Sequence, residues 1–80
     1  MNLEIITPDK KIFEGEVKSV ILPGADGSFG VLKNHAPIIS TLQKGKIKIT
    51  DNHQKTQSFD VNGGVVEVIK NKIIILAESV

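Results

Sequence analysis

Few side chains in this sequence could take part in chemistry, and three of them lie in residues 22–39, LPGADGSFGVLKNHAPII. Asp26, Ser28 and His35 are the residue types of a hydrolytic triad, in which histidine takes the proton of a nucleophilic serine. The stretch has neither the G-x-S-x-G pattern that exposes a nucleophile nor a visible oxyanion-hole motif. The sequence therefore does not favour a hydrolase. For His35 two interpretations remain, an exposed loop residue and a residue that contacts a partner.

Metal or nucleotide binding is the other chemistry to consider. A transition-metal site needs three or four converging ligands, but there is no cysteine, and the histidines, His35 and His53, lie in separate loops. The glycines of the segment PGADGSFG match neither a dinucleotide fingerprint nor a P-loop, and no helical pattern follows to offer its N-terminus to a phosphate. We therefore expect no metal, no cofactor and no bound nucleotide.

Lys10 offers a different kind of site, because it follows Asp9 in a predicted turn between two apolar segments. Lipoyl and biotinyl carrier domains are all-β, similar in length, and present a modified lysine at a hairpin tip. In those domains the lysine lies near mid-chain between two similar halves, whereas Lys10 is near the start and no second half mirrors the first. An ordinary charged turn is the simpler interpretation, and a carrier domain modified at Lys10 is kept as the alternative function.

The elements that position these residues are predicted to be strands. The 80 residues include 12 Ile, 8 Val and 4 Thr against 3 Ala, and β-branched side chains favour strands over helices. Short apolar segments alternate with turn signals, which predicts about eight to ten short, mostly antiparallel strands in a sandwich or barrel. Nothing divides the chain, so we predict a single all-β domain over residues 1–80.

Three local expectations follow from the same residues. Pro23 and Gly24 suit the central positions of a type II turn, because proline presets φ and glycine accepts a positive φ. Gly27 and Gly30 are expected to need unusual backbone angles. Residues 73–76 show no polar alternation, so they are expected to form a central strand that is covered on both faces.

Charge and composition exclude several classes of protein. Ten Lys against nine acidic residues leave a net charge of +1, and there are three Phe but no Arg. Nucleic-acid-binding proteins usually have a basic excess, arginines that read bases or aromatic residues that stack on them, so we expect no nucleic acid as partner. No apolar run approaches the ~20 residues of a membrane helix, and the N-terminus does not read as a signal peptide. We expect a chain that is soluble by itself and acts as an interaction module.

An ordered set of motifs runs along the chain. The central one is PGADGSFGVLKNHAP, preceded by LEIITPDKKIFEGEV and followed by TLQKGKIKI and VNGGVVEVIKNKIIILAES. The central motif resembles the hallmark PG-x-[DE]-G-x-[LF]-G-[IV]-L-x-x-HAP of the ε subunit of F-type ATP synthase, which is called δ in mitochondria. The resemblance is to its N-terminal β-sandwich domain and covers essentially all 80 residues in the right order and spacing.

This resemblance implies a flattened sandwich of about ten strands on the central stalk of the rotary enzyme. The subunit would turn with the rotor, couple ion translocation to ATP synthesis and perform no chemistry itself. Its partners would be the γ subunit and the c-ring, and it would be peripheral to the cytoplasmic face of a bacterial inner membrane. Carried over by position, the c-ring side maps to Asp26, Gly27, Ser28 and Phe29. The γ side maps to Thr7, His35 and Ser40.

The chain departs from the family pattern in two places. The family often has an acidic residue where Ser28 stands, which puts an ion pair with the c-ring at that point in doubt. Members commonly continue beyond the equivalent of residues 76–78 into two helices that can restrain ATP hydrolysis and in some members bind ATP. This chain stops at Val80, so we expect a short form that carries neither property. A naturally short gene and a truncated chain both remain open.

Overall fold

The fold is all-β, as expected from the composition. The computed structural model describes residues 1–78. Ser79, the last residue of the final motif, and Val80, the last residue of the chain, lie outside the described residues. Within residues 1–78 there is no helix. The strands are β1 (Asn2–Ile6), β2 (Lys11–Glu16), β3 (Ser19–Gly24), β4 (Gly27–Leu32), β5 (Ile38–Thr50), β6 (Thr56–Ile69) and β7 (Lys72–Ala77).

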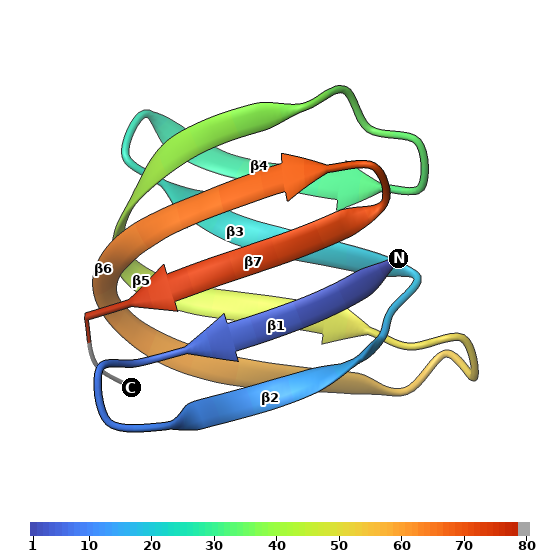
Figure 1. The fold of residues 1–80 in the computed structure, drawn as a ribbon, viewed down its shortest axis with the longest axis horizontal. Coiled ribbons are helices and arrows are strands. Elements are labelled where there is room, and N and C mark those ends of the chain that lie inside the picture. The colour runs from blue at the N-terminus through green and yellow to red at the C-terminus, as the bar shows by residue number, and fades with distance from the viewer. Residues whose placement is uncertain (79–80) are drawn as a thin grey trace.

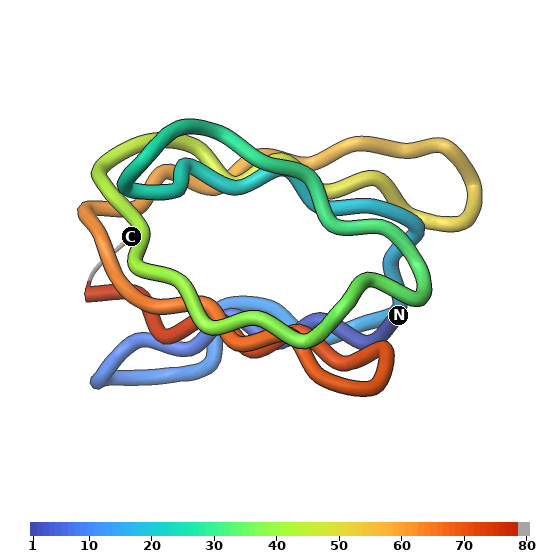
Figure 2. Tube along the Cα trace, turned by 90° about the horizontal axis from the view of Figure 1, so that it is seen from above, coloured from blue at the N-terminus to red at the C-terminus, as the bar shows by residue number. Residues whose placement is uncertain are grey.

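These strands form one sheet that folds over into two layers. The order is β2-β1-β7-β6-β5-β3-β4, and every described pair is antiparallel except β1 with β7. The long strands β5 and β6 curve from one layer into the other, so that the two layers face each other as a flattened sandwich (Figures 1 and 2). The first layer contains β2, β1, β7, the end of β6 and the start of β5. The second contains β3, β4 and the other halves of β5 and β6.

The number of strands is lower than the eight to ten expected, because several glycines lie inside strands and do not end them. β5 continues through Gly45, and β6 continues through Gly63 and Gly64. Gly64 has a φ of +149°, and a Cβ there would overlap the carbonyl oxygen of Leu76 on β7. Gly64 therefore lets β6 pass close to β7, and the lack of a side chain at Gly45 leaves room for the Pro23 side chain on β3. β5 and β6 thus continue from one layer into the other as single strands.

Two local expectations are wrong around the β3–β4 hairpin, and one is confirmed. Pro23 and Gly24 are not the centre of a turn but the end of β3, and the turn is formed by residues 25–26. The register between β3 and β5 shifts next to Pro23, so its missing N–H falls at an irregularity of the ladder, where proline is tolerated. Gly27 has a φ of +129°, as expected, but Gly30 has no positive φ.

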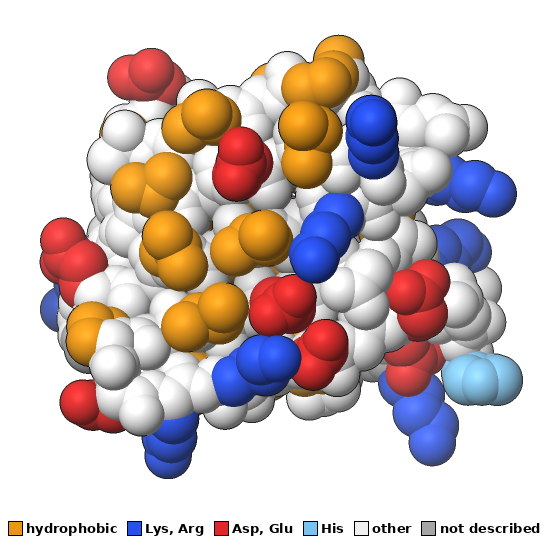
Figure 3. Space-filling view, viewed as in Figure 1, with side chains coloured by type: hydrophobic (Ala, Val, Ile, Leu, Met, Phe, Trp, Pro, Cys, Tyr) orange, Lys and Arg blue, Asp and Glu red, His pale blue; other side chains and the backbone are white. Residues whose placement is uncertain are grey.

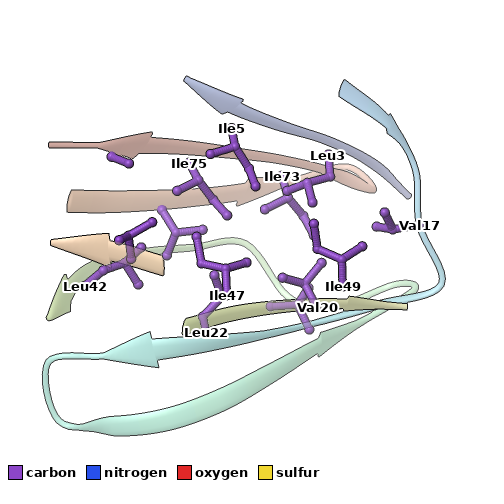
Figure 4. Packing of buried hydrophobic residues seen from close by; sticks show 14 of the residues in the cluster. Leu3, Ile5, Val17, Val20, Leu22, Leu42, Ile47, Ile49, Ile73 and Ile75 are labelled. Atoms are coloured by element: carbon purple, nitrogen blue, oxygen red, sulfur yellow. The ribbon is translucent and has the colours of Figure 1, made fainter. Parts of the chain in front are cut away.

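The core lies between the two layers. The side chains of Ile5, Ile73 and Ile75 from the first layer meet those of Leu22 and other residues from the second layer (Figure 4). Within residues 1–78 no polar or charged residue is buried, and all buried side chains are apolar. At the β2 edge, the rings of Phe13 and Phe59 meet edge to face, with their centroids 5.8 Å apart. The sandwich is therefore held together by burial of aliphatic side chains.

The β5–β6 hairpin is closed by the carboxylate of Asp51. It accepts hydrogen bonds from the backbone N–H of His53, at 2.8 Å, and of Lys55, at 3.0 Å. The bond from Lys55, followed by that from His53, holds the pKa of Asp51 below its usual range. Because the folded chain favours the ionised form, Asp51 contributes stability at neutral pH that is lost as the pH falls through its lowered pKa.

We therefore expect the free energy of unfolding of the wild-type chain to exceed that of Asp51→Asn by a constant amount above about pH 4, the ordinary carboxyl range. The difference should shrink at lower pH, because protonation makes Asp51 resemble the neutral amide. Urea unfolding at a series of pH values measures both curves. A difference that stays constant down to about pH 2, or that grows as the pH falls, would contradict this origin.

Candidate partner-binding surfaces

The outer face of the first layer carries a cluster of exposed apolar side chains (Figure 3). They belong to β1, β5, β6 and β7, and they point away from the core because successive residues of a strand alternate between its two faces. The most exposed are Ile39 at 75% and Leu76 at 54%. Exposed apolar patches of this kind mark interaction sites. We call this cluster the apolar face, and it consists of the exposed Ile39, Val65, Ile69 and Leu76 together with the half-buried Ile6 and Ile74.

The apolar face corrects the expectation for residues 73–76, which were predicted to be covered on both sides. Ile73 and Ile75 are fully buried, whereas Ile74 is half-buried and Leu76 is exposed. The absence of polar alternation therefore reflects an outer face that is apolar but uncovered in the single chain. Burying such side chains in an interface gains about 25 cal/mol per Å² of apolar surface removed from water, and this gain opposes the entropic cost of association.

Register places the apolar side chains in rows across the strands. Val65 on β6 pairs with Leu76 on β7, and Leu76 in turn pairs with Ile6 on β1. In the neighbouring row, Glu67 on β6 lies between Ile39 on β5 and Ile74 on β7. The apolar face is therefore continuous over four strands, with one carboxylate inside it.

The charged border of the apolar face lies on β1, β2 and β7. The carboxylate of Glu4 lies 3.4 Å from the ammonium of Lys11 and 3.6 Å from that of Lys72. Lys11 also contacts Glu14 at 2.9 Å, and the hydrogen bond to Glu14, followed by that to Glu4, raises the pKa of Lys11. These acids are neutralised within the chain. The side-chain carboxylate of Glu67, by contrast, has no hydrogen bond or ion pair with any described residue.

Two hollows extend the apolar face toward its ends. One is bordered by Pro37, Ile38, Ile39, Glu67, Val68 and Ile69. The other lies at the far end of β7 and is bordered by Ile6, Thr7, Pro8, Leu76 and Ala77. Both are lined mainly by apolar groups, so each could receive an apolar side chain of a partner.

The residues assigned to the γ side do not form one cluster. Thr7 is next to Leu76 in the second hollow, and its hydroxyl donates to the carbonyl of Lys10 at 3.1 Å. The loop that carries His35 is at the opposite end of β7, where the backbone N–H of Asn34 donates to Oδ1 of Asn71 at 2.9 Å. The ring Nδ1 of His35 lies 2.7 Å from the carbonyl oxygen of Ala36. These two positions therefore border opposite ends of the apolar face.

The side chain of Ser40, the third residue assigned to the γ side, does not point toward the apolar face. It pairs with the buried Val66 on β6, so its side chain is on the inner side of β5, whereas that of the preceding Ile39 is outside. Ser40 is only half-buried, because residues 38–40 pair with β6 alone among the described strands. It therefore stands at a sheet edge beside the apolar face.

The residues assigned to the c-ring side do come together, at the tip of the β3–β4 hairpin. Asp26, Gly27 and Ser28 are exposed, whereas Phe29 is half-buried against the core. The backbone N–H of Ala25 donates to the carbonyl of Thr41 at 2.9 Å, which ties the hairpin to β5. The tip is therefore a small polar projection on a rigid base, at the end of the sandwich where the β1–β2 turn also lies (Figure 1).

Lys10, the basis of the alternative function, lies in the β1–β2 turn. Its backbone N–H donates to the Thr7 hydroxyl at 3.3 Å, and its carbonyl accepts from the Thr7 N–H at 2.9 Å. This is a compact polar turn at the end of a sheet that has no internally repeated half. The arrangement does not support a carrier domain.

Within residues 1–78, no group of three or more acidic or histidine side chains is placed to hold a metal ion. The same residues include no helix long and apolar enough to cross a membrane. Sequence reasoning did not identify the apolar face or Glu67. The available signal was the occurrence of apolar residues at both odd and even positions of β6 and β7, a pattern that also predicts burial on both faces.

Comparison with known proteins identifies the family of the chain. All of residues 1–80 match the family model for the β-sandwich domain of the ATP synthase delta/epsilon chain. The chain is 46% identical to the ATP synthase epsilon chain of Chlorobium limicola, covering 98% of this chain and 89% of that one. It is also 46% identical to the epsilon chain of Campylobacter concisus, again over 98% of its length, but spans only 60% of that relative.

Solved structures share the fold. A chain in the mitochondrial ATP synthase of Euglena gracilis, from an assembly of OSCP, F1 and c-ring, superposes with a TM-score of 0.91 at 22% identity. The match covers 96% of this chain and 49% of that one. A chain from the central stalk and c-ring of the Tetrahymena thermophila enzyme gives a TM-score of 0.78 at 21% identity, over 96% of this chain and 62% of that chain.

Proposed function

This chain belongs to the β-sandwich family of ATP synthase delta and epsilon chains, and from that we propose that it is a non-catalytic subunit of the central stalk. In this role it links the γ subunit to the c-ring and couples ion translocation to ATP synthesis. Relatives such as the epsilon chain of Caulobacter vibrioides, at 42% identity, are bacterial. A position at the cytoplasmic face of a bacterial inner membrane, held there through the complex, follows from the same proposal.

The observation that carries this proposal is the apolar face. A stalk subunit has to be held by its partner along a broad surface, and the apolar face spans four strands of a layer whose other side is the core. We assign this face to the γ subunit. Thr7 and the His35 loop border its two ends, and Ser40 lies at the β5 edge beside it, so the contact would extend over these residues as well.

The tip of the β3–β4 hairpin is assigned to the c-ring. Asp26, Gly27 and Ser28 offer exposed polar groups suited to the polar loops of a ring, and Phe29 anchors the tip on the core. Because Ser28 is uncharged, the charge available at this tip is that of Asp26. A rigid hairpin on a packed sandwich transmits torque better than a mobile loop, because its backbone is held by ladder hydrogen bonds on both strands.

Binding to γ tests the proposal. We expect Leu76→Asp to weaken binding to a γ-containing F1 subcomplex at least tenfold, because a carboxylate would be buried in an apolar interface. Ile21→Asp is the matched control, because Ile21 is 46% exposed but lies on the outer face of the second layer. Calorimetric titration measures the affinity, and circular dichroism checks the fold. Equal losses for both variants, or no loss for Leu76→Asp, would refute the assignment of this face.

A further inference from the structure

We propose that the γ subunit places a lysine or arginine side chain against Glu67, and that this ion pair sets the register in which γ covers the apolar face. The inference rests on the proposed function for the identity of the partner. It goes beyond that function by naming the chemical group that the partner must supply and the residue of this chain that receives it.

The position of Glu67 is the first step. It is exposed on the outer side of β6, and its paired neighbours on both sides, Ile39 and Ile74, are apolar. The outward residues two positions away along β6 are Val65 and Ile69, which are also apolar. A partner that covers these four side chains has to cover Glu67 with them, because Glu67 lies inside the patch and not at its rim.

The charges around Glu67 are the second step. The cation nearest in register is Lys72, which pairs with Ile69, but its ammonium lies 3.6 Å from Glu4. Lys11 is shared between Glu4 and Glu14. The carboxylate of Glu67 has no hydrogen-bond or ion-pair partner among the described residues. In the free chain water solvates its carboxylate, and this solvation is lost when the face is covered.

The energetics are the third step. A carboxylate that is removed from water without a partner costs several kcal/mol, which would offset much of the gain from burying the surrounding aliphatic side chains. A guanidinium or ammonium group from the partner removes this penalty, and arginine can do so with two parallel hydrogen bonds. Because the carboxylate is a single point in an otherwise non-directional apolar surface, the pair would fix one register of docking over others.

Two competing roles for Glu67 lead to the opposite result. Glu67 could be protonated in the complex, or it could serve only to keep the apolar face soluble in the free chain. In both cases a variant with an uncharged residue at position 67 would bind γ as tightly as the wild-type chain, or more tightly. An ion pair with γ predicts the reverse, because loss of the charge leaves the buried cation of γ without its partner.

The experiment compares Glu67→Gln and Glu67→Leu with the wild-type chain in binding to a γ-containing F1 subcomplex, by calorimetric titration. We expect Glu67→Gln to bind about 30-fold more weakly or worse, and Glu67→Leu to be weaker still despite its added apolar surface. The control is Asp60→Asn, which removes an exposed charge paired with Lys46 on the other layer and should leave the affinity unchanged. All three variants alter exposed positions and should keep the wild-type circular dichroism spectrum.

The outcomes separate this inference from the proposed function. If the wild-type chain binds γ and Leu76→Asp does not, but Glu67→Gln and Glu67→Leu bind as well as the wild type, the ion pair is overturned while the docking face stands. If the wild-type chain does not bind γ at all, the proposed function fails and the inference fails with it. Loss of affinity in both Glu67 variants but not in Asp60→Asn supports the ion pair.

Discussion

Replacement of Gly64 by alanine is expected to lower the free energy of unfolding by roughly 3 kcal/mol or more, which is a large part of the stability of a domain this small. Gly64 has a φ of +149°, a conformation that side chains rarely adopt. An added Cβ would overlap the carbonyl oxygen of Leu76 and lie 3.0 Å from Cα of Ala77, both on the neighbouring strand β7. Backbone atoms cannot move aside as a flexible side chain can, so β6 and β7 would have to separate.

Urea unfolding of Gly64→Ala measures this cost, and Gly30→Ala is the matched control. Gly30 also lies inside a strand, but it has no positive φ, and the nearest atom to an added Cβ is the carbonyl oxygen of Val20 at 3.8 Å. We expect Gly30→Ala to change the free energy of unfolding by less than about 1 kcal/mol. A cost for Gly64→Ala no larger than that of the control would show that β6 does not need glycine where it passes β7.

The second large effect concerns two neighbouring residues of β7. Ile75→Ala is expected to lower the free energy of unfolding by about 2–5 kcal/mol, because Ile75 is fully buried and its truncation leaves a cavity between the layers. Leu76→Ala is expected to cost less than about 1 kcal/mol, because Leu76 is already 54% exposed. Binding to γ should show the opposite sensitivity, with the larger loss for Leu76→Ala at temperatures where both variants are folded.

Urea denaturation and calorimetric titration against a γ-containing F1 subcomplex together provide this comparison. Equal destabilisation by the two substitutions would mean that β7 is covered on both faces within the single chain. That is the expectation from the sequence, and the structure contradicts it. The opposite order of the two effects in folding and in binding is the signature of a strand with one side in the core and the other in an interface.

The all-β class could be predicted from the sequence because it depends on local preferences. The excess of isoleucine and valine over alanine favours strands at almost any position, and the turn signals place most of the reversals. The β3–β4 hairpin was located in this way, although its turn is at residues 25–26 and not at Pro23-Gly24. The family resemblance was equally accessible, since it depends on ordered motifs along the chain.

The number of strands could not be obtained in the same way. Glycine is a residue type that often ends a strand, but Gly45, Gly63 and Gly64 lie inside continuous strands, and Gly64 lets β6 pass close to the backbone of β7. Whether a glycine ends a strand or bends it depends on which strand lies beside it. That neighbour is chosen by pairing between segments far apart in the sequence, so a local pattern does not specify it.

Composition and the order of the motifs were enough to establish the class of the fold, the family and the lack of an evident catalytic motif. Which side of β7 is core and which belongs to the apolar face could be seen only in the folded chain, because residues 73–76 are all apolar and show no polar alternation. The same holds for the position of Glu67 between Ile39 and Ile74, because the pairing of β6 with β5 and β7 brings these three residues together. A carboxylate that looks like an ordinary exposed residue along the chain becomes, in the folded sheet, the one charge within an apolar patch of the described residues.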